Sequence, residues 1–226
     1  MAFELKTTVP WGRTLSEYKS MFSLTEAELK KRIISFGDGP ASFNSEMTED
    51  NKSVTSVDPV YQFTAKELEQ RIAEVKDMVI EQTRNNQDNF VWKQIKSVEE
   101  LEQVRLNAMQ AFIKDFSKGK AAGRYVFHAL PDKTAFEDLS FDLAISSHFL
   151  ILYAQLGLDF HITSITEMLR LANEVRIFPI LDLDAKKTEL LEQLITHFNS
   201  NFKVSIEKVD YEFQKGGNEM LRIKRD

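Results

Sequence analysis

Short apolar segments alternate with amphipathic helical segments along most of this 226-residue chain. The run "IISF" at 33–36 is followed by polar sequence and then by a second short run that ends near Val57. Later strand-like segments are "RYVFHALP", "FDLAISSHF" and "EVRIFPIL", and a helix is expected over 165–172 between the last two. Strands that alternate with helices form a parallel sheet, because each crossover returns the chain to the same end of the sheet. The pattern predicts an α/β fold with helices on both faces of the sheet.

Two parts of the chain depart from this alternation. The last strand-like runs, "KVSIEKVDYEF" and "EMLRIKR", flank Gly216-Gly217, which is typical of a hairpin and adds an antiparallel strand at the end. Between 64 and 123 the apolar residues recur every three or four positions, as in a helix. We therefore expect one domain over 1–226, with a Rossmann-like, mostly parallel seven-stranded sheet. A helical insertion over 64–123 would separate its second and third strands.

Composition excludes several kinds of site. The net charge is -6 and the basic residues are interspersed with acids, so no dedicated nucleic-acid surface is expected. The absence of cysteine excludes disulfides, thiolate zinc sites and cysteine nucleophiles. The four histidines have no metal-binding spacing, which predicts no metal. The start of the chain lacks a signal-peptide profile, and no apolar run is long enough to span a bilayer, so we expect a soluble, cytoplasmic protein of unknown oligomeric state without a membrane partner.

The turn "SFGDGPA" is the strongest functional signal in the chain. Gly37 and Gly39 follow the first strand, and glycine permits both a positive φ and close approach of the backbone to a ligand. The free N–H groups at the start of a following helix favour polar or anionic ligand atoms. Asp58 ends the second strand 21 residues beyond Gly37, where a carboxylate can accept from both hydroxyls of a ribose. The alternative is a tight strand-to-helix turn without a ligand.

The residues that follow the glycines bear on which nucleotide would bind. The dinucleotide fingerprint requires glycine or alanine at position 42, where this chain has Ser42. A looser pattern, Gly-x-Gly followed by a small residue two positions later, is met by Ala41. This comparison favours S-adenosylmethionine over a nicotinamide dinucleotide.

These segments together resemble class I S-adenosylmethionine-dependent methyltransferases, over roughly 25–63 and 123–226. "SFGDGPA" corresponds to the first motif of that family, "SVDP" to the second, "FHALP" to the third and "FDLAISSHF" to the fourth. The resemblance implies the strand order 3-2-1-4-5-7-6 and methyl transfer from S-adenosylmethionine to an acceptor, by default a small molecule. Residues 1–24 would form an N-terminal cap over the cofactor.

The resemblance also implies roles for individual residues. Gly37 and Gly39 would face the methionine part of the cofactor, and Asp58 would bind the ribose. Arg13 would pair with the methionine carboxylate, unless it is an exposed residue on a packing helix. The remaining expected cofactor contacts are Asp38 at the methionine ammonium, Ala41, Pro59, His128, Ala129 and Leu130 beside the adenine, and Ser146 and Ser147 on the floor of the site.

His148 is the candidate catalytic residue, because it follows the fourth strand beside the expected cofactor. A neutral imidazole there can accept a proton from an acceptor hydroxyl or amine. The alternative is a histidine that only bonds a loop. Two other functions stay open for the whole chain. One is a non-catalytic protein that binds S-adenosylmethionine on a methyltransferase fold, and the other, less favoured, is an NAD-dependent oxidoreductase.

Overall fold

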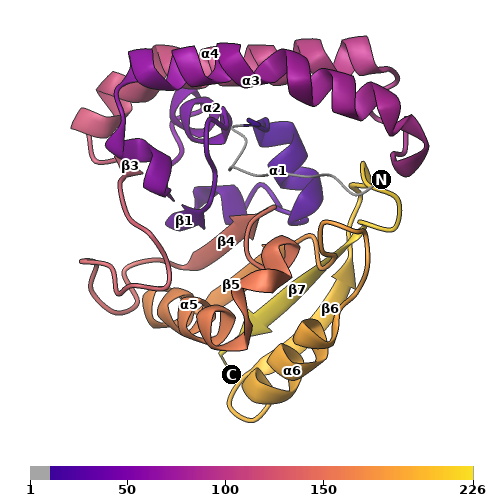
Figure 1. The fold of residues 1–226 in the computed structure, drawn as a ribbon. Helices are drawn as coiled ribbons and strands as arrows, with labels where there is room; N and C mark the ends of the chain where they lie inside the picture. Colours follow the sequence, from indigo (N-terminus) through magenta and orange to yellow (C-terminus); the bar gives the residue numbers. More distant parts are fainter. Residues whose placement is uncertain (1–10, 226) are drawn as a thin grey trace.

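A seven-stranded sheet forms the centre of the computed structural model, which describes residues 11–225 (Figure 1). Its spatial order is β3-β2-β1-β4-β5-β7-β6. The first five strands are parallel, and β7 is antiparallel to both of its neighbours. In chain order the strands are β1 (Ile33–Phe36), β2 (Val54–Val57), β3 (Tyr125–Val126), β4 (Leu143–Ser147), β5 (Glu174–Phe178), β6 (Lys203–Lys208) and β7 (Glu219–Lys224). The expected fold class is confirmed, including the strand order that the methyltransferase resemblance implies.

Helices cover both faces of the sheet. The longer ones are α1 (Leu15–Met21), α2 (Phe43–Glu49), α3 (Ala65–Asn85), α4 (Val98–Ala121), α5 (Leu158–Leu171) and α6 (Glu189–Phe198). Short 3-10 helices are η1 (Glu28–Lys30), η2 (Pro59–Gln62), η3 (Gln87–Asn89) and η4 (Ile151–Leu156). The helices α5 and α6 pack on one face, and α1 and α2 pack on the other (Figure 1). Within the described residues, no helix combines the length and apolar character needed to cross a membrane.

The helix α5 begins well before the predicted start at 165. Its first two turns bury His161 and Ser164 rather than apolar side chains. Both ring nitrogens of His161 lie within hydrogen-bond distance of carbonyls, 2.6 Å from Gly157 O and 2.9 Å from Leu150 O. An apolar-periodicity pattern misses these turns because the buried residues in them are polar.

The insertion between β2 and β3 consists mainly of α3 and α4, which lie side by side across one edge of the sheet (Figure 1). Aromatic side chains attach it to the sheet. Tyr61, after β2, packs its ring 6.0 Å from Phe112 of α4 and 5.3 Å from Tyr125 of β3. The expected helical insertion is therefore confirmed, and it lies near the strand ends that parallel sheets use for ligands.

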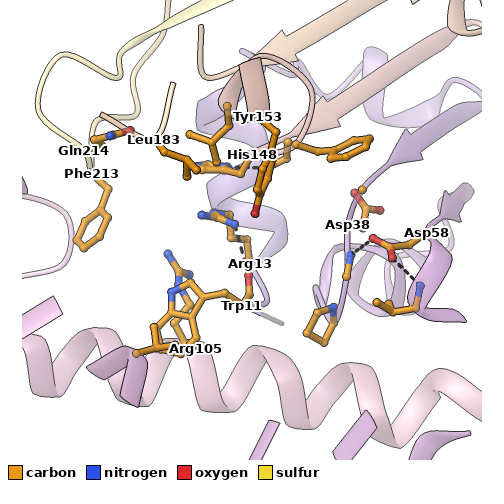
Figure 2. A pocket seen from close by; sticks show the side chains of 18 of the residues that line it. Trp11, Arg13, Asp38, Asp58, Arg105, His148, Tyr153, Leu183, Phe213 and Gln214 are labelled. Atoms are coloured by element: carbon orange, nitrogen blue, oxygen red, sulfur yellow. Dashed lines mark hydrogen bonds between the residues drawn. The ribbon is translucent and has the colours of Figure 1, made fainter. Parts of the chain in front are cut away.

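The carboxyl ends of the parallel strands open on a cavity (Figure 2). The loops after β1, β2 and β4 contribute residues 37–40, 58–60 and 147–149 to its wall, and the loop after β5 contributes 183–186. Residues of α3 and α4 line the same cavity. The insertion thus closes over the end of the sheet that holds the glycine turn.

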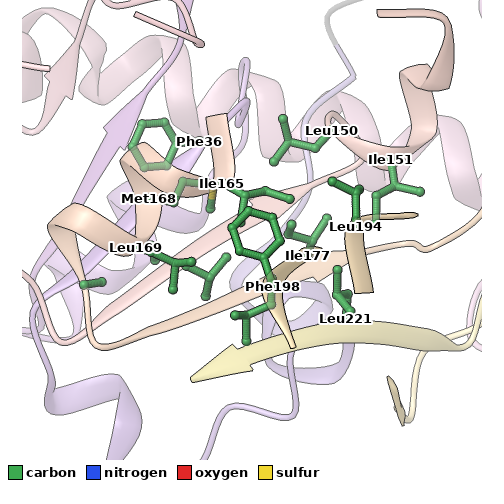
Figure 3. Packing of buried hydrophobic residues seen from close by; sticks show 14 of the residues in the cluster. Phe36, Leu150, Ile151, Ile165, Met168, Leu169, Ile177, Leu194, Phe198 and Leu221 are labelled. Carbon is green, nitrogen blue, oxygen red and sulfur yellow. The ribbon is translucent and has the colours of Figure 1, made fainter. Parts of the chain in front are cut away.

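The main core lies between the sheet and the helices α5 and α6 (Figure 3). Phe36, Ile177 and Leu221 of the strands pack there against helix residues such as Ile165 and Phe198. Alternate residues of the same strands point to a second core under α1 and α2, so both faces of the sheet are buried. The fully buried polar strand residues include Ser35 and Ser56, whose hydroxyls both bond to one carboxylate in the site described next.

Candidate functional site

The cavity at the strand ends has a volume of about 1240 Å³. Ligand pockets for small molecules usually measure about 300–1,000 Å³, so this one has room for more than one small ligand. Figure 2 shows Asp38 and Asp58 on one side of it, His148 and Arg13 in the middle, and Leu183 and Phe213 on the other side. Six aromatic residues line the wall: Trp11, Phe63, Phe90, Phe149, Tyr153 and Phe213.

The glycine turn adopts the backbone conformations that its sequence predicts. Gly37 has φ +77° and Gly39 has φ +53°, both in the left-handed region. A Cβ on Gly37 would lie 2.7 Å from Cβ of Phe149, whereas a Cβ on Gly39 would meet nothing within 4 Å. Gly37 is therefore required for packing as well as for its φ, and Gly39 leaves open space for a ligand.

The turn does not open directly into a helix. The helix α2 starts only at Phe43, is seven residues long, and has no side-chain cap at Ser42. The expectation that a helix start donates N–H groups beside the glycines is therefore wrong, because Pro40–Ser42 separate the two. Ala41 is buried and does not line the cavity.

Asp58 connects the first two loops of the cavity. Its Oδ2 accepts from the backbone N–H of Gly39 at 2.8 Å, and its Oδ1 accepts from that of Val60 at 2.8 Å. Burial raises the pKa of this carboxyl to about 6 despite these two bonds. Each carboxylate oxygen can accept more than one hydrogen bond, so both remain competent to receive ligand hydroxyls.

Asp38 also lines the cavity, but its carboxylate is engaged inside the protein. Tyr18 donates to it at 2.6 Å and Ser56 at 2.6 Å, and Ser35 donates as well. Burial raises the pKa of Asp38, while the three hydroxyls oppose the rise. These three hydrogen bonds hold the Asp38 carboxylate inside the protein. The sequence analysis had instead expected it to contact the methionine ammonium of the cofactor.

A buried ion pair joins α1 to the helix α4 of the insertion; of the expected N-terminal cap over 1–24, residues 1–10 lie outside the described part of the chain. Arg105 of α4 donates two hydrogen bonds of 2.6 Å to Glu17 of α1, and Tyr211 donates another at 2.9 Å. The backbone of Thr14 donates a further bond at 3.0 Å, so the oxygens of Glu17 are saturated. Burial alone would raise the pKa of Glu17, but Arg105 lowers it to about 2.

Arg13 lies beside this pair without a carboxylate of its own. Within residues 11–225, no acidic group comes within ion-pair distance of it, and its buried Nε has no hydrogen-bond partner. The guanidinium donates one long hydrogen bond, from Nη1 to the carbonyl of Trp11 at 3.4 Å. Burial and the charge of Arg105 lower its pKa. Glu17 is in ion-pair contact with Arg105 and acts on Arg13 only at longer range, so among the described residues the Arg13 guanidinium lines the cavity without a carboxylate in contact (Figure 2).

His148 follows β4 with φ +53°, a conformation that non-glycine residues rarely adopt. Its Nδ1 lies 2.9 Å from Oγ of Ser147, and both residues line the cavity. Burial lowers the pKa of His148 well below its ordinary value, and the nearby Arg13 and Arg105 lower it further. The imidazole is therefore neutral at physiological pH.

Several expected cofactor contacts lie away from the cavity wall. His128, Ala129 and Leu130 follow the two-residue strand β3, and Nε2 of His128 lies 2.7 Å from the carbonyl of Asp132. The third motif is therefore in a loop rather than at a strand end, and the expected placement beside the cavity is not observed. Ser146 is also outside the wall, with a buried Oγ that has no partner. The expected residues that the structure brings together are Arg13, Gly37, Asp38, Gly39, Asp58, Pro59, Ser147 and His148.

The sequence analysis missed Arg105 and Glu17. Arg105 occupies a buried position on α4 between Leu101 and Ala108, where the helical repeat calls for an apolar residue. An arginine at a buried position of an otherwise apolar helix face is the signal that could have identified Arg105. No cluster of three or more metal-ligating side chains occurs in the part of the chain that the structure describes.

The strand order is that of the class I methyltransferase fold, and the cavity lies at the carboxyl ends of its parallel strands. No family model matches the chain. It is 36% identical over 223 residues to the uncharacterized protein MJ0045 of Methanocaldococcus jannaschii. The match covers 98% of each chain. The chain belongs to the family of MJ0045.

Solved structures with a similar arrangement are more distant. A putative S-adenosyl-L-methionine-dependent methyltransferase of Methanococcus maripaludis is 12% identical, with a TM-score of 0.45 over 93% of this chain and 83% of that one. The magnesium protoporphyrin IX methyltransferase of Synechocystis, solved with its cofactor, is 11% identical, with a TM-score of 0.43 over 86% and 69%. The 16S rRNA methylase RmtB is 14% identical, with a TM-score of 0.42 over 93% and 61%. The fold assignment rests on the strand order of this chain.

Proposed function

We propose that this protein is an S-adenosylmethionine-dependent methyltransferase that acts on a small molecule. The observation that carries the proposal is the unpaired guanidinium of Arg13, which faces the same cavity as Asp58 and the turn at Gly37 and Gly39. A partly buried cation without a carboxylate in contact favours an anionic ligand, so a ligand carboxylate that pairs with Arg13 would be bound strongly.

The residues present fit the polar groups of S-adenosylmethionine. Arg13 would hold the methionine carboxylate with its free Nε, and Asp58 would accept from the ribose hydroxyls. The open space beside Gly39 leaves room for the ligand at the turn. Pro59, Val60 and Phe63 line the wall next to Asp58 and would provide an apolar surface for the adenine. This arrangement replaces the expected contacts from 128–130.

The cofactor supplies a methyl group activated by a positively charged sulfur. The chain would contribute positioning, because an in-line displacement needs the acceptor atom held close to that methyl group. His148 would accept the proton of an acceptor hydroxyl or amine on its unprotonated ring nitrogen. The aromatic wall would exclude water, with the N-terminal cap and the insertion over 64–123 closing the site from two sides.

The acceptor is proposed to be a small molecule because the cavity exceeds the usual size of a single-ligand pocket and is enclosed by aromatic side chains. The net charge of -6 disfavours a nucleic acid. The lack of cysteine suits a reducing compartment, and we propose the cytoplasm as the location.

Transfer of a labelled methyl group tests the function and the acceptor class together. The protein is incubated with S-adenosylmethionine tritiated in its methyl group and with separate small-molecule, RNA and protein fractions of a cell extract. We expect label in the small-molecule fraction. Label in RNA would overturn the acceptor class. No transfer by a protein that binds the cofactor would favour the non-catalytic alternative, and binding of NAD instead would favour an oxidoreductase.

Substituting Arg13 by methionine should separate ligand binding from stability. Losing the partner of a bound carboxylate costs about 2 kcal/mol or more, so affinity for S-adenosylmethionine should fall about 30-fold. The free energy of unfolding should stay unchanged or rise, because the variant removes an unpaired charge. Decarboxylated S-adenosylmethionine is the control ligand and should bind both proteins equally in a calorimetric titration. An equal loss for both ligands would contradict the role of Arg13.

A further inference from the structure

One end of the cavity is built by two segments that are distant in the sequence, the tip of the insertion and the loop between β6 and β7. The backbone N–H of Val91 donates to the carbonyl of Phe213 at 2.7 Å, and that of Lys215 donates to the carbonyl of Asn89 at 3.0 Å. Figure 2 shows Phe213 across the cavity from Asp58. Backbone pairing therefore fixes the shape of the cavity at the end that lies away from the glycine turn.

Aromatic rings form the surface of this end. Phe90 and Phe213 both line the cavity, and their rings are stacked, with 4.7 Å between the centroids and 18° between the planes. Trp92 packs edge-on against Phe213 at 5.4 Å, but it is outside the described part of the cavity wall. Leu183, from the loop after β5, adds an apolar side chain. Phe90, Phe213 and Leu183 together form the aromatic end of the cavity.

The aromatic end is suited to a flat ring. Aromatic side chains gain energy from stacked or edge-on contacts with another ring beyond the gain from burying its area. A saturated ring of the same size would gain only from the burial of area. The pair of Phe90 and Phe213 therefore favours a flat aromatic ligand over an aliphatic one.

His148 lies between the aromatic end and the side of the cavity that holds Asp58 (Figure 2). A cavity of about 1240 Å³ has room for a ligand at each end. A ring seated at the aromatic end would thus have the neutral imidazole between itself and a cofactor at the glycine turn. Such a weak base suits a ring hydroxyl with a pKa near 10, like that of tyrosine, better than the far less acidic hydroxyl of an aliphatic alcohol.

We propose that Phe90 and Phe213 form the acceptor subsite and that the acceptor is a flat aromatic compound with a hydroxyl group on its ring. Methylation of this compound rests on the proposed function, whereas binding of the ring does not. In the reaction, the hydroxyl oxygen would form a bond to the methyl carbon, and the bond from sulfur to that carbon would break with its electron pair left on sulfur. The hydroxyl proton would pass to His148. The products are an aryl methyl ether and S-adenosylhomocysteine.

Two probes that differ only in their rings test the recognition step. Full-length protein saturated with S-adenosylhomocysteine is titrated calorimetrically with 2-naphthol and with decahydro-2-naphthol, its saturated counterpart. The bound S-adenosylhomocysteine keeps both probes out of the cofactor side. We expect 2-naphthol to bind about fivefold more tightly than decahydro-2-naphthol, the size of effect that one or two ring contacts produce. Equal binding, or tighter binding of decahydro-2-naphthol, would overturn the proposal.

Two variants locate the bound ring. Phe213→Leu keeps an apolar side chain and should abolish the preference for 2-naphthol while the affinity for S-adenosylhomocysteine stays unchanged. Trp92→Leu is the matched control, because Trp92 contacts Phe213 but is outside the described cavity wall, and it should keep the preference. A preference retained in Phe213→Leu, or lost equally in both variants, would overturn the assignment to this end of the cavity.

Transfer from S-adenosylmethionine tritiated in its methyl group tests the reaction. The unaltered protein should label 2-naphthol but not decahydro-2-naphthol, and Phe213→Leu should raise the KM for 2-naphthol about fivefold with kcat unchanged. Equal labelling of both probes, or no labelling of 2-naphthol by protein that binds it together with the cofactor, would overturn the acceptor class. Failure of S-adenosylhomocysteine to bind would instead remove the proposed function, and the two probes would then test the aromatic subsite in the ligand-free protein.

Discussion

Replacing His148 by asparagine should slow methyl transfer by about 100- to 10,000-fold, the range that general base catalysis contributes. The expected cause is loss of the only neutral base that lines the described cavity wall at the end of β4. Asparagine is chosen because it tolerates the φ of +53° better than other polar residues. Affinity for S-adenosylmethionine should be unchanged, since no cofactor contact is assigned to the imidazole.

The labelled-methyl assay measures this effect under single-turnover conditions. His197→Asn, at an exposed position on α6, is the matched control and should retain full activity. A His148→Asn protein that transfers methyl groups at the normal rate would show that the acceptor loses its proton without help from the chain. His148 would then be a residue that only bonds its loop.

Glu17→Gln should lower the free energy of unfolding by about 3–5 kcal/mol at neutral pH. Glutamine keeps the shape of the side chain but leaves the buried Arg105 and the partly buried Arg13 as two neighbouring cations. Urea unfolding measures the loss. The double variant Glu17→Gln/Arg105→Met removes the second charge and should recover most of the stability. A loss below about 1 kcal/mol in the single variant would show that water solvates the pair.

The same pair makes stability depend on pH in a defined window. The pKa of Glu17 is about 2 in the folded protein, against an ordinary value of 4.5. A lowered pKa stabilises the fold above about pH 4.5 and loses that contribution as the pH falls towards 2, here about 3 kcal/mol. This share of the acid sensitivity should be absent from Glu17→Gln, and an identical pH profile in both proteins would refute the assignment.

The local chemistry of the glycine turn and of Asp58 could be predicted from sequence because it depends on a few neighbouring residues. Glycine permits the positive φ values that residues 37 and 39 adopt. Alternation and the terminal hairpin predicted a mostly parallel sheet with an antiparallel strand, and the resemblance to methyltransferases implied the strand order that the structure has. These features depend on backbone conformation, which residue types and short sequence patterns indicate.

Contacts between distant segments could not be predicted in this way. The pairing of Glu17 with Arg105 joins residues 88 positions apart, through a helix whose pattern marks that position as apolar. The residues His128 to Leu130, which were expected to contact the cofactor, lie outside the cavity wall in a loop that follows the two-residue strand β3. The anchoring of Asp38 by hydroxyls of Tyr18, Ser35 and Ser56 likewise depends on the folded arrangement of three segments.

Calorimetric titration of the purified protein with S-adenosylhomocysteine, with NAD as the comparison ligand, tests the central claim most directly. The account predicts one site with a dissociation constant in the micromolar range for S-adenosylhomocysteine, and no measurable binding of NAD. It also predicts that Asp58→Asn, which keeps one oxygen acceptor, weakens this binding. Absence of binding by S-adenosylhomocysteine, or tighter binding of NAD, would contradict the assignment of this cavity to S-adenosylmethionine.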